Sequence, residues 1–454
     1  MSDTEPQSDG TETPLPDHIL KPHGRPVQPI PMNKDGQQYV ALRDPSMLVN
    51  QSMVIPPQAM NLIQFFQGEM TIDEITEKFV PADKVPDEAQ RKSTMERLRA
   101  DIVGLAQNMD KFGLLWGPTF DDYEKQRMEK LEEAGAFPPQ ASMSLLSVAE
   151  QNDAEALGKP PEDQSKQLAW AAEHSRKVLK DWLAEAEDPE FDITPVGLVV
   201  PHLDFLRGGE VYASAYRAWS DAKAPDRIVI LGTNHFGIGD GVVSSKHGYD
   251  TALGRVKADA EVMNKLETKL GDRLFKDQLD LMAEHSIELH IPWIQELFGN
   301  DVPVIAALMP DPLVPMIEED GARVSGPEFV AALKEILAES GGTTYFISSA
   351  DLSHVGPQFG EPKPVDDERR LEVETHDREM MTRYLSNDPG AFVEAMEWSK
   401  NPTRWCSVGN MTAVAELAAA GEIELLDYRQ ASDDSGAHMV SIASMALIPA
   451  SDPA

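Results

Sequence analysis

Apolar residues along the second half of the chain follow two alternating spacings. Short apolar runs predict strands at residues 196–200, 228–231, 302–306 and 345–348. Helical spacing predicts helices between them at residues 210–219, 258–270, 287–298 and 327–339. Two further apolar runs predict closing strands at residues 423–428 and 440–448. Strands that alternate with helices indicate an α/β domain, here residues 191–450, with a mostly parallel sheet covered by helices.

The first 190 residues have a different pattern. Residues 1–35 are polar and acidic with few large apolar groups, so we expect a disordered acidic tail. Residues 36–118 contain two short strand-like runs and then helices, which predicts a small winged-helix-like α+β module without a basic recognition helix. Residues 119–190 predict a helical connector, and the apolar stripe in residues 164–187 predicts packing on the following domain.

The composition narrows the class of partner. The net charge of −37 would repel phosphates, so we expect no nucleic acid and no anionic membrane as partner. No apolar run reaches the roughly 18 residues of a membrane span, and the polar, acidic first residues lead us to expect no secretory signal. The single cysteine excludes an internal disulfide and fits a reducing compartment. These features predict a cytoplasmic protein.

Histidines follow three of the predicted strands. His202, His235 and His354 each come a few residues after an apolar run. Because parallel strands end at one edge of the sheet, where ligands bind in open α/β folds, these imidazoles can converge. One histidine after a strand is usually explained by capping or packing. Three in succession favour a functional site.

Two more segments add candidate side chains. Glu284 and His285 begin a predicted helix and leave the imidazole free to reach the same edge, whereas His290, further along, is either a site residue or a buried structural one. Cys406 precedes the predicted helix at residues 411–420 and is either a small buried hydrophobe or a metal-binding thiolate. Two imidazoles and a thiolate suit iron, copper or zinc, and a three-ligand set leaves one coordination position open.

The ordered motifs resemble those of a known family. They are Pro201–Phe205, Leu231–His235, Glu284–Pro292, Ser348–His354 and Cys406. Together they are similar to the Memo family, also called AmmeMemoRadiSam system protein B, over residues 140–450. The resemblance implies a fold like that of class III extradiol dioxygenases.

The resemblance also implies roles for individual residues. The metal-binding positions would be His202, His235 and Cys406, with iron or copper as the metal. By the same resemblance His354 matches a pocket histidine that acts as acid–base catalyst, and His285 and Asp351 would line the cavity.

The chain departs from the family pattern near these positions. Leu203, Asp204 and Phe205 follow His202 where Ala, Gly and Tyr are usual. Ser407 replaces a glycine after Cys406, and Asn410 stands where a proline is common. These changes keep the ligand atoms but alter their surroundings.

Three functions fit these residues. The first is a metal-dependent redox enzyme, related to extradiol dioxygenases, that acts on a small-molecule or peptide substrate. The second is a non-catalytic peptide- or protein-binding scaffold, with a protein partner contacted through the N-terminal module. The third is a structural zinc site, for which Asp204 or Asp351 could supply the fourth ligand.

Overall fold

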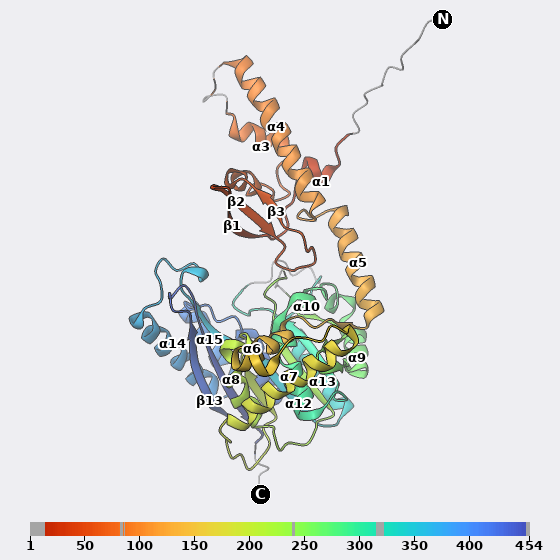
Figure 1. The fold of residues 1–454 in the computed structure, drawn as a ribbon, viewed down its shortest axis with the longest axis vertical. Helices are drawn as coiled ribbons and strands as arrows, with labels where there is room; N and C mark the ends of the chain where they lie inside the picture. The colour runs from red at the N-terminus through yellow and green to blue at the C-terminus, as the bar shows by residue number, and fades with distance from the viewer. Residues whose placement is uncertain (1–13, 82–84, 86, 238–240, 315–321, 451–454) are drawn as a thin grey trace, which may run out of the picture. The chain divides into compact units, whose positions relative to one another are not determined.

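The computed structural model describes residues 14–81, 85, 87–237, 241–314 and 322–450, and the chain divides into two compact units, Met1–Lys130 and Leu131–Ala454. Figure 1 shows the course of the chain through both units. Each unit has a buried apolar cluster formed by its own residues.

The first unit contains a three-stranded antiparallel sheet in the order β1-β2-β3. Its strands are β1 (Gln28–Lys34), β2 (Gln37–Arg43) and β3 (Met53–Ile55). Its helices are α1 (Asp17–Leu20), α2 (Met60–Ile63), α3 (Ile72–Phe79) and α4 (Glu88–Lys111). Side chains from the sheet and helices share one buried cluster. This is an α+β arrangement.

The expectation of disorder up to residue 35 is wrong for the described part of that segment. Residues 14–35 contain α1 and β1, while residues 1–13 lie outside the described residues. Asp35 and Gly36, both with positive φ, form the two-residue turn that joins β1 to β2. An Asp-Gly pair between strands is a strong hairpin signal, and the polar character of β1 obscures it.

The second unit is built on a mixed sheet of eight strands in the order β12-β14-β5-β11-β6-β10-β7, with β13 paired to β14. The four central strands are parallel: β5 (Gly197–Val200), β11 (Thr344–Ser349), β6 (Arg227–Thr233) and β10 (Val304–Met309). The outer strands are β7 (Val243–Ser244), β12 (Asp351–Val355), β13 (Glu422–Ser432) and β14 (Met439–Ile448).

The prediction of a mostly parallel sheet is therefore corrected. The outer strands pair antiparallel with their neighbours. The chain ends in a hairpin, β13–β14, and β14 pairs antiparallel with β5 on the side opposite β11. The parallel centre agrees with the predicted alternation of strands and helices.

Helices cover this sheet. They include α8 (Phe205–Arg217), α9 (Ala260–Leu270), α12 (Ile291–Phe298), α13 (Gly326–Ser340), α14 (Asp367–Leu385), α15 (Pro389–Ser399) and α16 (Val408–Ala418). Side chains of β6 and β10 share one buried cluster with α9, α13 and α16. The predicted helix at residues 287–298 is broken into α11 (His285–Glu288) and α12. Within the described residues, no helix has both the length and the apolar character that crossing a membrane requires.

The segment expected to be a connector is helical, and most of it belongs to the second unit. Helix α5 (Pro118–Ala134) contains the division between the units, and α6 (Leu145–Leu157) and α7 (Gln164–Glu185) follow it. Helix α7 contacts α8 and α12. Its apolar stripe therefore packs on the α/β domain, as the sequence predicts.

The contact between α7 and α8 depends on a buried glycine. A methyl group at Gly209 would overlap the indole of Trp182, which stacks on the buried Trp293. We expect Gly209→Ala to lower the free energy of unfolding by about 1–3 kcal/mol, as overpacking does in other cores. Gly104→Ala is the matched control, because nothing lies within 4 Å of the added atom and alanine favours a helix. Urea denaturation followed by circular dichroism measures both; an equally stable Gly209→Ala variant would contradict the packing argument.

Candidate metal site

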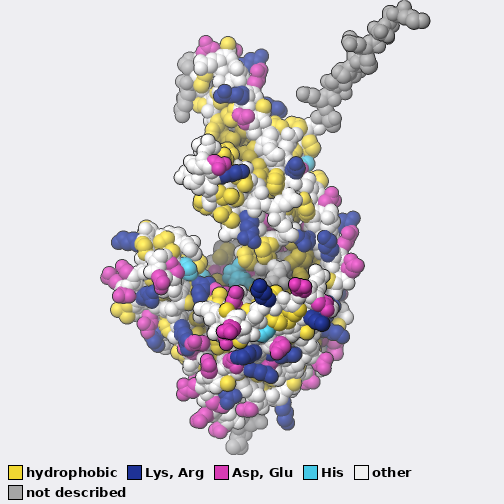
Figure 2. Space-filling view, in the orientation of Figure 1, with side chains coloured by type: hydrophobic (Ala, Val, Ile, Leu, Met, Phe, Trp, Pro, Cys, Tyr) yellow, Lys and Arg dark blue, Asp and Glu magenta, His cyan; other side chains and the backbone are white. Residues whose placement is uncertain are grey.

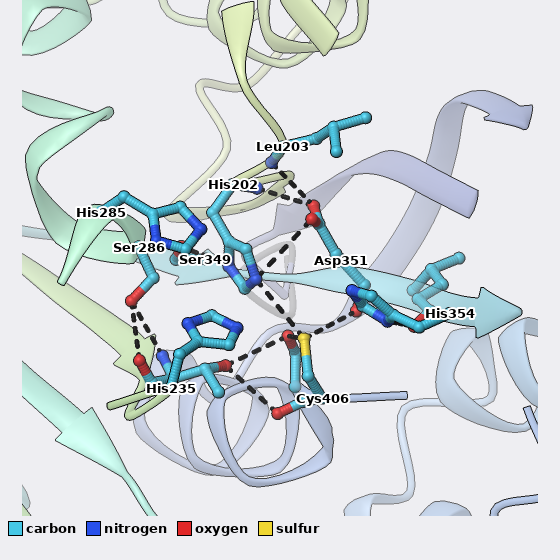
Figure 3. Close-up of polar contacts among 12 residues, drawn as sticks. His202, Leu203, His235, His285, Ser286, Ser349, Asp351, His354 and Cys406 are labelled. Carbon is cyan, nitrogen blue, oxygen red and sulfur yellow. Dashed lines mark hydrogen bonds and ion pairs between the residues drawn. The ribbon is translucent and has the colours of Figure 1, made fainter. Parts of the chain in front are cut away.

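Two predicted histidines meet at the edge where the parallel strands end. His202 lies two residues beyond β5 and His235 two residues beyond β6, and β11 runs between these strands. Their ring centroids are 5.0 Å apart. The convergence expected from parallel strand ends is therefore present for this pair (Figure 3).

A third imidazole joins them from α11. The ring of His285 lies 5.5 Å from that of His202 and 4.9 Å from that of His235, centroid to centroid. One ligand atom from each of the three histidines lies within 4.8 Å of the other two, which is close enough for one metal ion. The sequence predicts His285 as a lining residue, and the structure places it among the potential ligands.

Cys406 lies at the same centre. Its Sγ is 3.4 Å from Nε2 of His202 and 3.2 Å from Oγ of Ser407. Figure 3 shows the sulfur pointing toward His202, on the side where Asp351 and His354 lie. The centre therefore offers four potential donors, three imidazoles and one sulfur.

The Nδ1 atoms of the three imidazoles each have a neighbour that orients the ring. Nδ1 of His202 lies 3.0 Å from Oγ of Ser349, and Nδ1 of His235 lies 3.0 Å from Oε1 of Glu284. The same Glu284 oxygen is 3.3 Å from Nδ1 of His285. Partners on Nδ1 leave the Nε2 atoms available, which is how carboxylates and hydroxyls orient histidine ligands.

The electrostatics of this cluster give its imidazoles different affinities for a proton. Burial lowers the pKa of His202 well below its usual value, and the neighbouring His235 and His285 lower it further. Burial alone would raise the pKa of Glu284, yet the same two histidines lower it to about 2. Burial likewise opposes protonation of His235, but Glu284 and Cys406 raise its pKa well above the usual value. A fully buried carboxylate thus stays ionised beside imidazoles that cannot all be protonated.

His354 occupies a different position from the one that the strand-end pattern predicts. It lies within strand β12, next to a register shift between Asp351 and His354, and not in a loop. Its Nδ1 is 3.0 Å from the carbonyl oxygen of Leu352 and 3.1 Å from that of Arg404. Because carbonyls only accept, Nδ1 carries the proton and Nε2 has a free lone pair. Burial lowers the pKa of His354 to about 4.

Asp351 holds the turn that carries His202. Its Oδ1 accepts hydrogen bonds from the backbone N–H groups of His202 (2.8 Å) and Leu203 (3.1 Å). Its Oδ2 is 3.7 Å from Nε2 of His202, beyond hydrogen-bond distance. Burial raises the pKa of Asp351 to about 7. The carboxylate that orients ligand imidazoles is therefore Glu284, and Asp351 orients the backbone.

The substituted family positions have structural roles. Asn410 donates from its side chain to Oγ1 of Thr233 (2.8 Å) and to the carbonyl of Ser349 (2.7 Å), which ties α16 to the ends of β6 and β11. Asp204 caps α8 and forms an ion pair with Arg207, and it does not bond to the cluster.

His290 belongs to the core. It is fully buried, its Nδ1 is 2.9 Å from the hydroxyl of Tyr216, and burial lowers its pKa to about 3. The structure therefore favours a structural role for His290 over a role in the site.

Sequence reasoning missed a buried carboxylate below the site. Asp377, in the middle of α14, is fully buried and accepts hydrogen bonds from Ser353, Trp405, Tyr428 and Ser441. Ser353 and Trp405 directly precede His354 and Cys406 in the chain. Asp377 therefore joins β12, the Cys406 loop and β14, but no local pattern marks an aspartate inside a charged helix.

Asparagine at position 377 would place an amide N–H₂ against groups that donate to the carboxylate. We expect Asp377→Asn to lower the free energy of unfolding by about 1–3 kcal/mol. Glu374→Gln, one turn earlier on α14, removes only a partly exposed pair with Arg378 and should change stability by less than about 0.5 kcal/mol. Thermal and urea unfolding compare the two variants; equal stability of Asp377→Asn and the parent would show that this network contributes little.

The second unit is similar in sequence to proteins of one family. The model of the Memo family, described as Memo-like protein, matches residues 169–447, all within the second unit. A MEMO1 family protein of Methanopyrus kandleri is 27% identical over 296 residues, which cover 63% of this chain and 93% of that protein. Another, of Methanococcoides burtonii, is 32% identical over 248 residues, covering 54% of this chain and 83% of that protein. The match to the family model covers more than half of the chain, so this protein belongs to the Memo family.

Proposed function

We propose that the second unit is a metal-dependent redox enzyme that binds iron or copper through His202, His235 and Cys406. The observation that supports this proposal most directly is the group of imidazoles whose ligand atoms lie within 4.8 Å of one another, with the Cys406 sulfur 3.4 Å from Nε2 of His202. The substrate is proposed to be a small organic molecule or a peptide.

The donor set fits such a metal. Imidazole nitrogen and thiolate sulfur suit iron, copper and zinc better than the oxygen-preferring magnesium or calcium. Ser349 and Glu284 orient the rings before any ion binds, and this orientation reduces the entropy lost on binding. A bound iron or copper ion would supply redox chemistry and an open coordination position.

The residues around these donors can move a proton. Nε2 of His354 can accept one, because Nδ1–H is held by two carbonyl groups and the buried ring is neutral above about pH 4. Figure 3 shows His354 on the side of the site where Asp351 and the sulfur of Cys406 lie. We therefore assign His354 as the general base, with His285 as a wall of the pocket or an additional ligand.

The metal content of variants distinguishes Cys406 from His285 as the third ligand. We expect Cys406→Ala and His202→Ala to lower stoichiometric iron or copper at least tenfold in protein purified without oxygen, because each removes a donor atom. His285→Ala is the matched comparison and should retain most of the metal. Elemental analysis and the sulfur-to-copper absorption band provide the readout.

Three outcomes would contradict this assignment. Loss of metal in His285→Ala with retention in Cys406→Ala would make three imidazoles the site. A parent protein that binds neither iron nor copper would favour the binding-scaffold function, and one that binds only zinc, without redox activity, would favour a structural site.

If His354 is the general base, replacing it should lower the turnover number without removing the metal. His354→Gln should retain the metal and reduce the turnover number by about 10²- to 10⁴-fold, the usual contribution of a general base. Because the base must be unprotonated, the parent rate should fall as the pH drops through about 4. Oxygen consumption with small organic and peptide substrates measures both, and His174→Gln on α7 is the control. Loss of metal in His354→Gln would instead make His354 a ligand.

A further inference from the structure

A groove lies between α14 and α15, outside the metal site. It encloses about 640 Å³, and its lining includes His376, Glu379 and Arg383 of α14 and Ala391, Glu394 and Trp398 of α15. The two helices pack against each other at one side of the second unit (Figure 1). None of the lining residues contributes to the metal site.

Trp398 is the most exposed large hydrophobic side chain of the described residues, with 87% of its surface accessible. The chain has seven tryptophans, and Trp219, Trp293 and Trp405 are fully buried. Within the described part of the chain, no other ring and no basic side chain stacks on the Trp398 indole. An aromatic side chain left this exposed is typical of a contact point for a partner.

Helical spacing places the indole beside a carboxylate and small residues. Glu394 and Ala395 each lie three or four residues from both Ala391 and Trp398, so the four side chains lie on one face of α15. The alanines leave space next to the ring, and the buried Met380 of α14 adds apolar lining. This face can accept the apolar stem of a long side chain.

The groove has an excess of acidic side chains, which favours a basic partner. Glu379, Glu394 and Glu397 line it against a single arginine, Arg383. Over the described residues, no ion pair joins any of these three glutamates to a basic side chain, whereas Glu374 of α14 pairs with Arg378. Figure 2 shows acidic and basic side chains scattered over the visible face of the second unit. Unpaired carboxylates beside an exposed indole are the components of a cation-binding surface.

We propose that this groove docks a basic segment of another protein, with an arginine or lysine side chain lying on the indole of Trp398 and its charge balanced by Glu394. The stem of such a side chain packs on the alanines while its head remains near the carboxylates. The overall charge of −37 adds long-range attraction for a basic partner. The proposal is independent of the redox function.

The test uses the full chain labelled with 5-fluorotryptophan. The probe is an acetylated and amidated hexapeptide of alternating arginine and alanine, and the matched probe replaces arginine with citrulline, which has a similar shape and no charge. The fluorine resonance of Trp398, assigned by its loss in Trp398→Phe, should shift with the arginine peptide while that of the buried Trp219 stays in place. Affinity should fall about two- to fivefold in Trp398→Ala and in Glu394→Gln, and should weaken as salt rises.

Leu371→Ala and Glu416→Gln serve as controls, because both side chains are exposed outside the groove. Circular dichroism confirms that the variants, all at surface positions, remain folded. An arginine peptide that shifts other resonances but not that of Trp398 would overturn the proposal. Equal binding of the citrulline peptide would also overturn it, since the site would then be apolar. A concentration-dependent shift without peptide would assign the groove to a second copy of the chain.

Discussion

The buried carboxylate of Glu284 organises the site. Its side chain has no solvent exposure, so its negative charge must be balanced by hydrogen bonds and positive partners. It accepts hydrogen bonds from the backbone N–H groups of His235 and Ser286, both at 2.8 Å, and contacts the rings of His235 and His285. One side chain thus joins the turn after β6 to the start of α11. Glu284 therefore sets the distance between the imidazoles of His235 and His285.

The sequence contains enough information to predict the parallel centre of the sheet. Apolar runs alternate with helical spacing, and the first polar residues after β5 and β6 must then lie at one edge. That rule brings His202 and His235 together without knowledge of any other contact. The rule does not predict the position of His354. Only Ala350 separates β11 from β12, and His354 lies inside β12 instead of in a loop after β11.

Other features depend on contacts between residues far apart in the chain. Asp377 is one acidic residue among many on α14, and only the folded chain shows that four donors surround it. The antiparallel addition of β14 to β5 is a tertiary pairing that strand-like patterns cannot distinguish from a parallel one. The hairpin at Asp35–Gly36 is a different case, since its signal is local and lies in a segment whose polarity indicated disorder.

The position of Cys406 is set by the ends of two neighbouring strands, β6 and β11. The hydroxyl of Thr233, at the end of β6, donates to the carbonyl of Cys406 at 3.2 Å, and Asn410 joins Thr233 to Ser349 at the end of β11. Ser349 also contacts the ring of His202. The sulfur is therefore held in register with His202 and His235 by bonds that require no metal. His285, by comparison, is oriented through Glu284, which it shares with His235. Because Thr233 holds the carbonyl of Cys406 and Glu284 holds the ring of His285, both potential third donors are positioned by contacts within the protein.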